Sequence, residues 1–241
     1  MKYDDMIEKK NFFDKMHLSG REIQELIIAW LLLSVVFLAF RLKPPSEDQM
    51  LVFILTFISL IFVFGAAFIF HELAHKYAAI SLGGKAEFRL DSRGMMITVV
   101  SMIIGFGILV PGAVFWSSDY ARYSNIRGRI SAAGPLTNMV LAAMFLTLLP
   151  LSNLLGLSIV QITGSIEVIW ILKTVIGTGF SLNLLLGMFN LLPVWILDGK
   201  KIFDASTILW ITIAIGFLGM YMFSYSIFNF RLGIGFGFIQ L

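Results

Sequence analysis

Five long apolar runs decide what this chain can fold into. They lie at about residues 24–42, 50–82, 131–150, 166–192 and 205–228. A helix of about 20 apolar residues crosses the roughly 30 Å hydrocarbon core of a bilayer. Apolar residues make up 58% of the chain and charged residues 14%, whereas soluble domains average about 45–50% and about 25%. This composition predicts an all-α integral membrane helical bundle with five to six transmembrane helices, and it excludes soluble, disordered and nucleic-acid-binding proteins.

Residues 1–22 differ from the rest of the chain because charged side chains of both signs are frequent there. A cleavable signal peptide has a short basic start and a small-residue cleavage site, whereas this start carries acids and the first apolar run ends at a Pro-Pro pair. We therefore expect a cytosolic arm at 1–22 and one membrane-embedded domain at 23–241, with its core at 50–204. The chain has no cysteine, so a metal would have to bind His, Asp or Glu.

The strongest motif is His-Glu-x-x-His at residues 71–75, within the second apolar run. Residues four apart share one face of a helix, about 6 Å apart along its axis, so His71 and His75 can bind one tetrahedral Zn²⁺. Glu72 lies beside them, where it can take a proton from water activated by the metal. The alternative is a pair of interfacial histidines without a metal. Ionisable clusters within apolar spans are costly, which favours the metal site.

A catalytic zinc site needs a third protein ligand and one open position. His17, the third histidine of the chain, lies in the charged arm and is most simply a surface residue. Asp198 directly follows the fourth apolar run and lies near membrane depth. An Asp before a Gly, as in Asp198-Gly199, also forms ordinary turns. The residues alone leave both interpretations of Asp198 open.

Two motifs lie in order on separate spans: His71-Glu72-x-x-His75, and Asn190-x-x-Pro193-x-x-x-x-Asp198-Gly199. Both match motifs of the site-2 protease family of intramembrane zinc metalloproteases, which this chain resembles over about residues 50–204. The segment 133–138, Ala-Gly-Pro-Leu-Thr-Asn, is similar to a Gly-Pro segment found between the two motifs in many members. One departure follows the second motif, where two lysines replace the Gly-Arg of many members.

The resemblance implies one Zn²⁺ per chain, bound by His71, His75 and Asp198, with Glu72 as the general base. It implies that Asn190 holds the substrate or the oxyanion through its side-chain amide, for which an interhelical hydrogen bond is the alternative. The implied function is hydrolysis of peptide bonds in or near transmembrane segments of a substrate protein within the lipid bilayer. The alternatives are a catalytically silent membrane scaffold of the same fold and, less favoured, a divalent-cation transporter.

The topology follows from the requirement that His75 and Asp198 meet at one ion. The number of complete crossings between them must then be even, and the runs at 131–150 and 166–192 supply two. The apolar segment 95–115 is therefore expected to be re-entrant, interfacial or strand-like. This arrangement puts 14 of the 18 Lys and Arg residues on the side of the N-terminus and the zinc site. The positive-inside rule assigns that side to the cytosol, so we expect a multi-pass cell-membrane protein in this orientation.

Residues 85–90 alternate polar and apolar side chains, which predicts a small strand element after the His-Glu-x-x-His helix. Its edge would suit an extended substrate, bound by β-augmentation. A hairpin that only packs against the bundle is the equally favoured alternative. We expect a polar loop at 116–130, a helix start at Gly134-Pro135 and a linker at 151–165. We expect the side chain of Asn138 to bridge helices.

Overall fold

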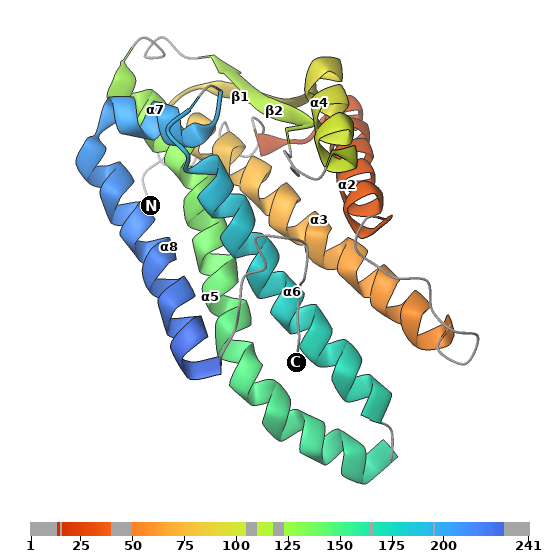
Figure 1. Cartoon of the computed structure of the whole chain (residues 1–241). Helices are drawn as coiled ribbons and strands as arrows, with labels where there is room; N and C mark the ends of the chain where they lie inside the picture. The colour runs from red at the N-terminus through yellow and green to blue at the C-terminus, as the bar shows by residue number, and fades with distance from the viewer. Residues whose placement is uncertain are drawn as a thin grey trace, which may run out of the picture.

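The computed structural model describes residues 14, 16–39, 50–104, 110–117, 123–163, 166–194 and 196–228. Helices dominate this part of the chain, and a two-stranded sheet lies at one end of the bundle (Figure 1). The elements are α2 (Gly20–Ala39), α3 (Met50–Ser81), β1 (Lys85–Leu90), α4 (Ser92–Ile103), β2 (Gly112–Ser117), α5 (Ser124–Thr163), α6 (Ile166–Asn190), α7 (Asp198–Ala205) and α8 (Thr207–Phe228).

The bundle is built around α3, α5 and α6, with α2 on one side and α8 on the other (Figure 1). Within the described residues, four helical segments are long and apolar enough to cross a membrane: Phe53–Ser81, Ser124–Leu151, Ile171–Asn190 and Thr207–Ser226. Sequence analysis predicted five to six spans. The additional span at 24–42 corresponds to α2, which is not among the four, and its last residues lie outside the described part, so this span stays a prediction.

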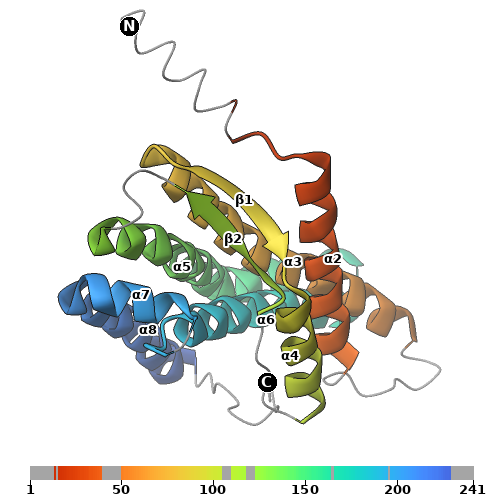
Figure 2. The ribbon, with the colours of Figure 1, turned by 90° about the horizontal axis from the view of Figure 1, so that it is seen from above.

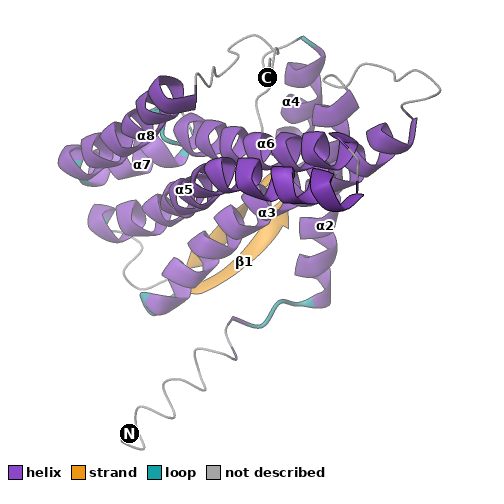
Figure 3. Ribbon diagram, turned by 90° about the horizontal axis from the view of Figure 1, so that it is seen from below, coloured by secondary structure: helices purple, strands orange, loops and turns teal. Residues whose placement is uncertain are grey.

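Two clusters of buried apolar side chains hold the helices together. One joins α2, α3, β1 and α6, with Leu33, Phe64, Phe88 and Leu182 among its members. The other joins α5, α6, α7 and α8 and is built around side chains such as Phe180 of α6. Helix α6 contributes to both clusters, so it packs against both halves of the bundle. Seen from the other end in Figure 3, helices fill the view and β1 lies beyond α3.

The strands β1 and β2 pair antiparallel, in a register that runs from Lys85 opposite Ser117 to Leu90 opposite Gly112. The predicted strand at 85–90 is confirmed. Because Leu90 lies opposite Gly112, residues 91–111 leave the sheet and return to it at the same end. Helix α4 within this segment has 12 residues and is about 18 Å long, too short to cross a core of roughly 30 Å. This agrees with the expectation that 95–115 does not span the membrane.

Helix α5 is longer than the sequence predicted. The expected loop at 116–130 gives way to helix at Ser124, and the expected linker at 151–165 is helical as far as Thr163. The predicted helix start at Gly134-Pro135 is also wrong, because Pro135 and Pro150 both lie inside α5. The prediction treated proline as a helix boundary, whereas packed membrane helices tolerate it when neighbouring groups satisfy the freed backbone.

Candidate metal centre

The C-terminal part of α3 carries His71, Glu72 and His75, and all three side chains are buried. The helix continues to Ser81, so the motif lies well inside regular helix and the two histidines share one face. Their ring centroids are 4.8 Å apart and the rings are nearly perpendicular. Figure 1 shows this end of α3 below the sheet.

Asp198 is the first residue of α7 and is also buried. Helix α6 ends at Asn190, and a short connection leads back to Asp198. Two contacts hold this connection in place. The indole N–H of Trp210 donates a 2.7 Å hydrogen bond to the carbonyl oxygen of Leu191. Gly199 packs so closely on the Leu191 carbonyl that a Cβ atom at position 199 would overlap it. The Asp-Gly pair therefore allows α7 to begin directly against the end of α6.

The structure brings His71, His75 and Asp198 together. Each side chain offers one ligand atom, and these three atoms all lie within 4.8 Å of one another. The Nε2 atoms of the two histidines are 3.1 Å apart. Oδ2 of Asp198 lies 3.4 Å from His71 Nε2 and 2.9 Å from His75 Nε2. Ligand atoms around a tetrahedral zinc ion, at about 2.0–2.2 Å from the metal, lie about 3.3–3.6 Å apart. The donor triangle therefore has nearly the dimensions that zinc requires.

The other ring nitrogens of the histidines are held by α5. Nδ1 of His71 lies 2.5 Å from Oδ1 of Asn138. Nδ1 of His75 lies 2.8 Å from the carbonyl oxygen of Ile130. Both partners accept hydrogen bonds, so each histidine carries its proton on Nδ1 and turns an Nε2 lone pair toward the triangle. Asn138 is itself fixed, because its Nδ2 donates to the carbonyl of Ala67 at 3.1 Å and to Oδ1 of Asn183 at 3.0 Å.

Sequence analysis gave Asn138 only a bridging role and missed Ile130 and Gly134. Asn138 does bridge helices, and it also orients His71. Gly134 lies between the other two on α5, and a Cβ atom there would overlap both imidazole rings. The three residues are spaced by four, which places them on one face of α5. This spacing is visible in the sequence, but it is informative only once α5 is known to run through Pro135.

The carboxylate of Asp198 is ionised in this setting. Burial raises the pKa of Asp198, whereas the positive charge of the nearby Lys201 ammonium lowers it and favours the charged form. Lys201 contacts the oxygen that faces away from the histidines, with Nζ 3.2 Å from Oδ1. The other carboxylate oxygen, Oδ2, therefore remains on the side that faces the two histidines. Two neutral imidazoles and one carboxylate form a donor set that suits a zinc ion.

A cleft of about 410 Å³ opens beside the triangle. Glu72, the histidines, Asp198, Asn190 and the strand β2 contribute to its lining. Asn190 donates a 3.0 Å hydrogen bond from Nδ2 to the carbonyl of Leu186 in its own helix. Its role toward a substrate and the interhelical alternative both stay predictions. His17 lies in a different pocket, where its backbone carbonyl accepts a hydrogen bond from Lys76.

Comparisons with known proteins agree with this geometry. The model of Peptidase family M50 matches residues 59–214. "Putative zinc metalloprotease MJ0611" of Methanocaldococcus jannaschii is 33% identical over 207 residues, which cover 85% of this chain and 95% of that protein. "Putative zinc metalloprotease YwhC" of Bacillus subtilis is 32% identical over 151 residues, 57% of this chain and 64% of that protein. No solved structure matches significantly. This chain therefore belongs to peptidase family M50, the site-2 protease family of zinc metalloproteases.

Proposed function

We propose that this protein is an intramembrane zinc endopeptidase, in which His71, His75 and Asp198 hold one zinc ion. The observation that carries the proposal is the buried donor triangle on the end of a helix apolar enough to span a membrane, next to Glu72 and an open cleft. A zinc ion in this place would supply Lewis-acid activation of water and of the scissile carbonyl. The hydrogen bonds that the two Nδ1–H groups donate favour this role, because they direct the opposite ring nitrogens toward one point.

Glu72 has the general-base role in this proposal. Its carboxylate lines the cleft next to the triangle and is not itself one of the three grouped donors. It accepts the proton of the attacking water and then delivers it to the leaving amine. Asn190 lines the same cleft. We propose that its amide, which already donates one hydrogen to its own helix, stabilises the negative charge that develops on the scissile carbonyl oxygen.

The outer edge of β2 is the proposed binding site for an extended substrate. The N–H of Phe88 bonds to Glu22 on α2, so Phe88 and its partner Val114 form a pair whose backbone groups point away from each other. The backbone groups of Val114 therefore face the outer edge of β2, and Val114 lines the same cleft as Glu72. In the described part of the chain, β2 pairs only with β1. A substrate strand paired with β2 would pass directly by Glu72.

The membrane supplies the proposed substrates. Four described helices suit a multi-pass protein, and we propose that α2 adds a fifth span and that the N-terminus and the cleft face the cytosol. A transmembrane helix must unwind before its peptide bonds can be cut, because helix hydrogen bonds occupy the backbone groups that β2 would pair with. We therefore propose that cleavage favours transmembrane segments weakened by Gly or Pro near the cytosolic side.

A defined membrane peptide tests this function. The full chain, reconstituted with zinc in liposomes, is given a synthetic transmembrane peptide with Gly and Pro in its cytosolic half, beside a poly-Leu peptide of equal length. We expect mass spectrometry to find cuts in the weakened peptide only, and none with the Glu72→Gln variant. Cuts confined to residues outside the bilayer would contradict intramembrane cleavage. A zinc-loaded protein that cuts neither peptide would favour the silent-scaffold alternative.

A further inference from the structure

The outer edge of β1 is covered by two carboxylates from α2. The backbone N–H of Phe88 donates a 3.0 Å hydrogen bond to Oε1 of Glu22, and that of Leu90 donates a 2.9 Å bond to Oε2 of Glu25. The two donors are two residues apart, so they belong to the same edge of the strand. Figure 2 shows β1 between β2 and α2. Helix α2 therefore occupies the place of a third strand and supplies acceptors from side chains.

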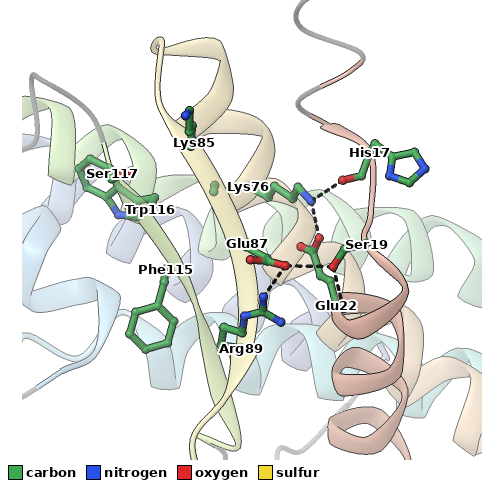
Figure 4. A pocket seen from close by; sticks show the side chains of 11 residues that line it. His17, Ser19, Glu22, Lys76, Lys85, Glu87, Arg89, Phe115, Trp116 and Ser117 are labelled. Carbon is green, nitrogen blue, oxygen red and sulfur yellow. Dashed lines mark hydrogen bonds and ion pairs between the residues drawn. The ribbon is translucent and has the colours of Figure 1, made fainter.

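Glu22 also connects the sheet to the helix that carries the metal centre. Its Oε2 lies 2.6 Å from Nζ of Lys76, the residue that follows His75, and both residues are 1% exposed. Figure 4 shows Lys76 between Glu22 and the backbone carbonyl of His17. One carboxylate thus contacts three elements: α2 carries it, β1 donates to one oxygen and α3 pairs with the other.

The contacts of Glu22 and Glu25 do not orient the residues of the metal centre. Its histidines are oriented by Asn138 and Ile130 of α5, on the other side of α3. The strand β2, by contrast, depends on β1, with which it forms the whole two-stranded sheet. A two-stranded ribbon alone has little stability in water, so its position must come from what it packs on. In the described structure, α2 and α3 provide that support through Glu22, Glu25 and the apolar contacts of Phe88.

We propose that Glu22 and Glu25 are positioning residues. They hold the β1–β2 sheet in the position in which β2 lines the cleft beside the metal centre. They act on substrate binding through the sheet and do not affect zinc binding. This inference rests on the proposed function for its effect on cleavage. Its effect on the sheet is independent of that function. The carbonyl oxygen of a glutamine can replace either carboxylate as an acceptor, whereas an apolar side chain cannot.

A pair of matched double variants isolates the hydrogen bond from the ion pair. Glu22→Gln/Lys76→Met removes both buried charges and keeps an acceptor for Phe88. Glu22→Met/Lys76→Met removes the charges and the acceptor. Replacing both members of a buried ion pair is tolerated far better than removing one, so both variants are expected to fold. Three quantities are measured for each: zinc content, amide hydrogen exchange of residues 85–90, and KM and kcat for the weakened transmembrane peptide.

We expect the Gln-containing variant to match the wild type in all three measurements. The Met-containing variant should keep its zinc and exchange the β1 amides roughly tenfold faster, because a buried N–H loses its acceptor. Its KM should rise while kcat changes much less, which distinguishes a displaced binding edge from general instability. Equal exchange in the two variants would overturn the proposal, as would loss of zinc from the Met-containing variant alone.

Failure of the proposed function gives a different result. If the wild type cuts no peptide, KM cannot be compared, and the exchange rates and zinc content alone decide whether the carboxylates hold the sheet. If a variant at position 22 does not fold, Glu25→Gln and Glu25→Leu repeat the comparison at the rim of the sheet, where Leu90 is the donor. Faster exchange of β1 with Glu25→Leu but not with Glu25→Gln would support the proposal, and equal exchange would overturn it.

Discussion

Asn138→Ala is the substitution for which the structure gives the sharpest expectation. The Asn138 side chain is fully buried and makes three hydrogen bonds, one to each of His71, Ala67 and Asn183. Alanine removes all three and leaves the Nδ1 proton of His71 without an acceptor. The imidazole then loses the contact that fixes its orientation and tautomer. Because His71 provides one of the three donor atoms, we expect the loss to reduce zinc affinity directly.

The expected magnitude follows from similar contacts to metal-binding histidines. Removing the partner of a ligating histidine weakens metal affinity about 10–100-fold, or about 1.4–2.8 kcal/mol. We expect Asn138→Ala to fall within this range. Asn138→Asp keeps an acceptor for His71 but loses the Nδ2 donor to Ala67 and Asn183. We therefore expect it to bind zinc more tightly than Asn138→Ala while lowering the thermal stability of the bundle.

The assay is a zinc competition titration with a chromophoric chelator on detergent-purified protein. Asn183→Ala is the matched control, since it removes a partner of Asn138 and leaves the contact to His71 intact. It should change the zinc dissociation constant by less than about threefold, because it removes two neutral hydrogen bonds and neither of them involves a histidine. Equal zinc affinity in Asn138→Ala and the wild type would refute the reasoning, as would an equal loss in both alanine variants.

Three further changes separate the parts of the site. Gly134→Ala should abolish zinc binding, because its Cβ would overlap both imidazoles, whereas Gly219→Ala on α8 meets no neighbour within 4 Å and should keep a full zinc content by metal analysis. Asp198→Ala should lower the zinc content from about one ion per chain. Asp204→Ala is the control, because Asp204 forms an exposed ion pair with Lys200, and it should keep its zinc. An unchanged zinc content in Asp198→Ala would show that Asp198 is not a ligand. Glu72→Gln should retain zinc and lose peptide cleavage, and cleavage by this variant would contradict its role as the base.

The sequence predicted the parts of this protein that depend on spacing along one helix or strand. The histidines four apart share a face of α3, and the alternation at 85–90 is a strand. Both follow from the geometry of a single element. The premise of the even-crossing argument is confirmed, because His75 and Asp198 meet with donor atoms 2.9 Å apart. In the described part of 95–115, a 12-residue helix and a strand agree with the expectation that this segment does not span.

Contacts between elements could not be predicted in the same way. The bond from His71 to Asn138 depends on the relative heights of α3 and α5, which side-chain packing decides. The prolines added a specific error, since treating Pro135 as a boundary separated Ile130 from Gly134 and Asn138. Glu22 lies in the expected arm and Glu25 near the start of the first apolar run, and sequence analysis predicted no partner for either. Their partners are backbone amides of β1, which no residue pattern identifies.

The face of α5 formed by Ile130, Gly134 and Asn138 has a consequence for folding. Zinc can bind only when α5 lies in the correct register against α3. A shift of α5 by one residue would remove the acceptors that Asn138 and Ile130 provide, and it would place a side chain against the imidazoles. A bound ion joins α3 to α7 across more than 120 residues of sequence, and α5 is locked between them. By mass action, each tenfold excess of free zinc over its dissociation constant would add about 1.4 kcal/mol to the stability of this arrangement. The zinc supply would then determine how much of the protein holds its helices in register.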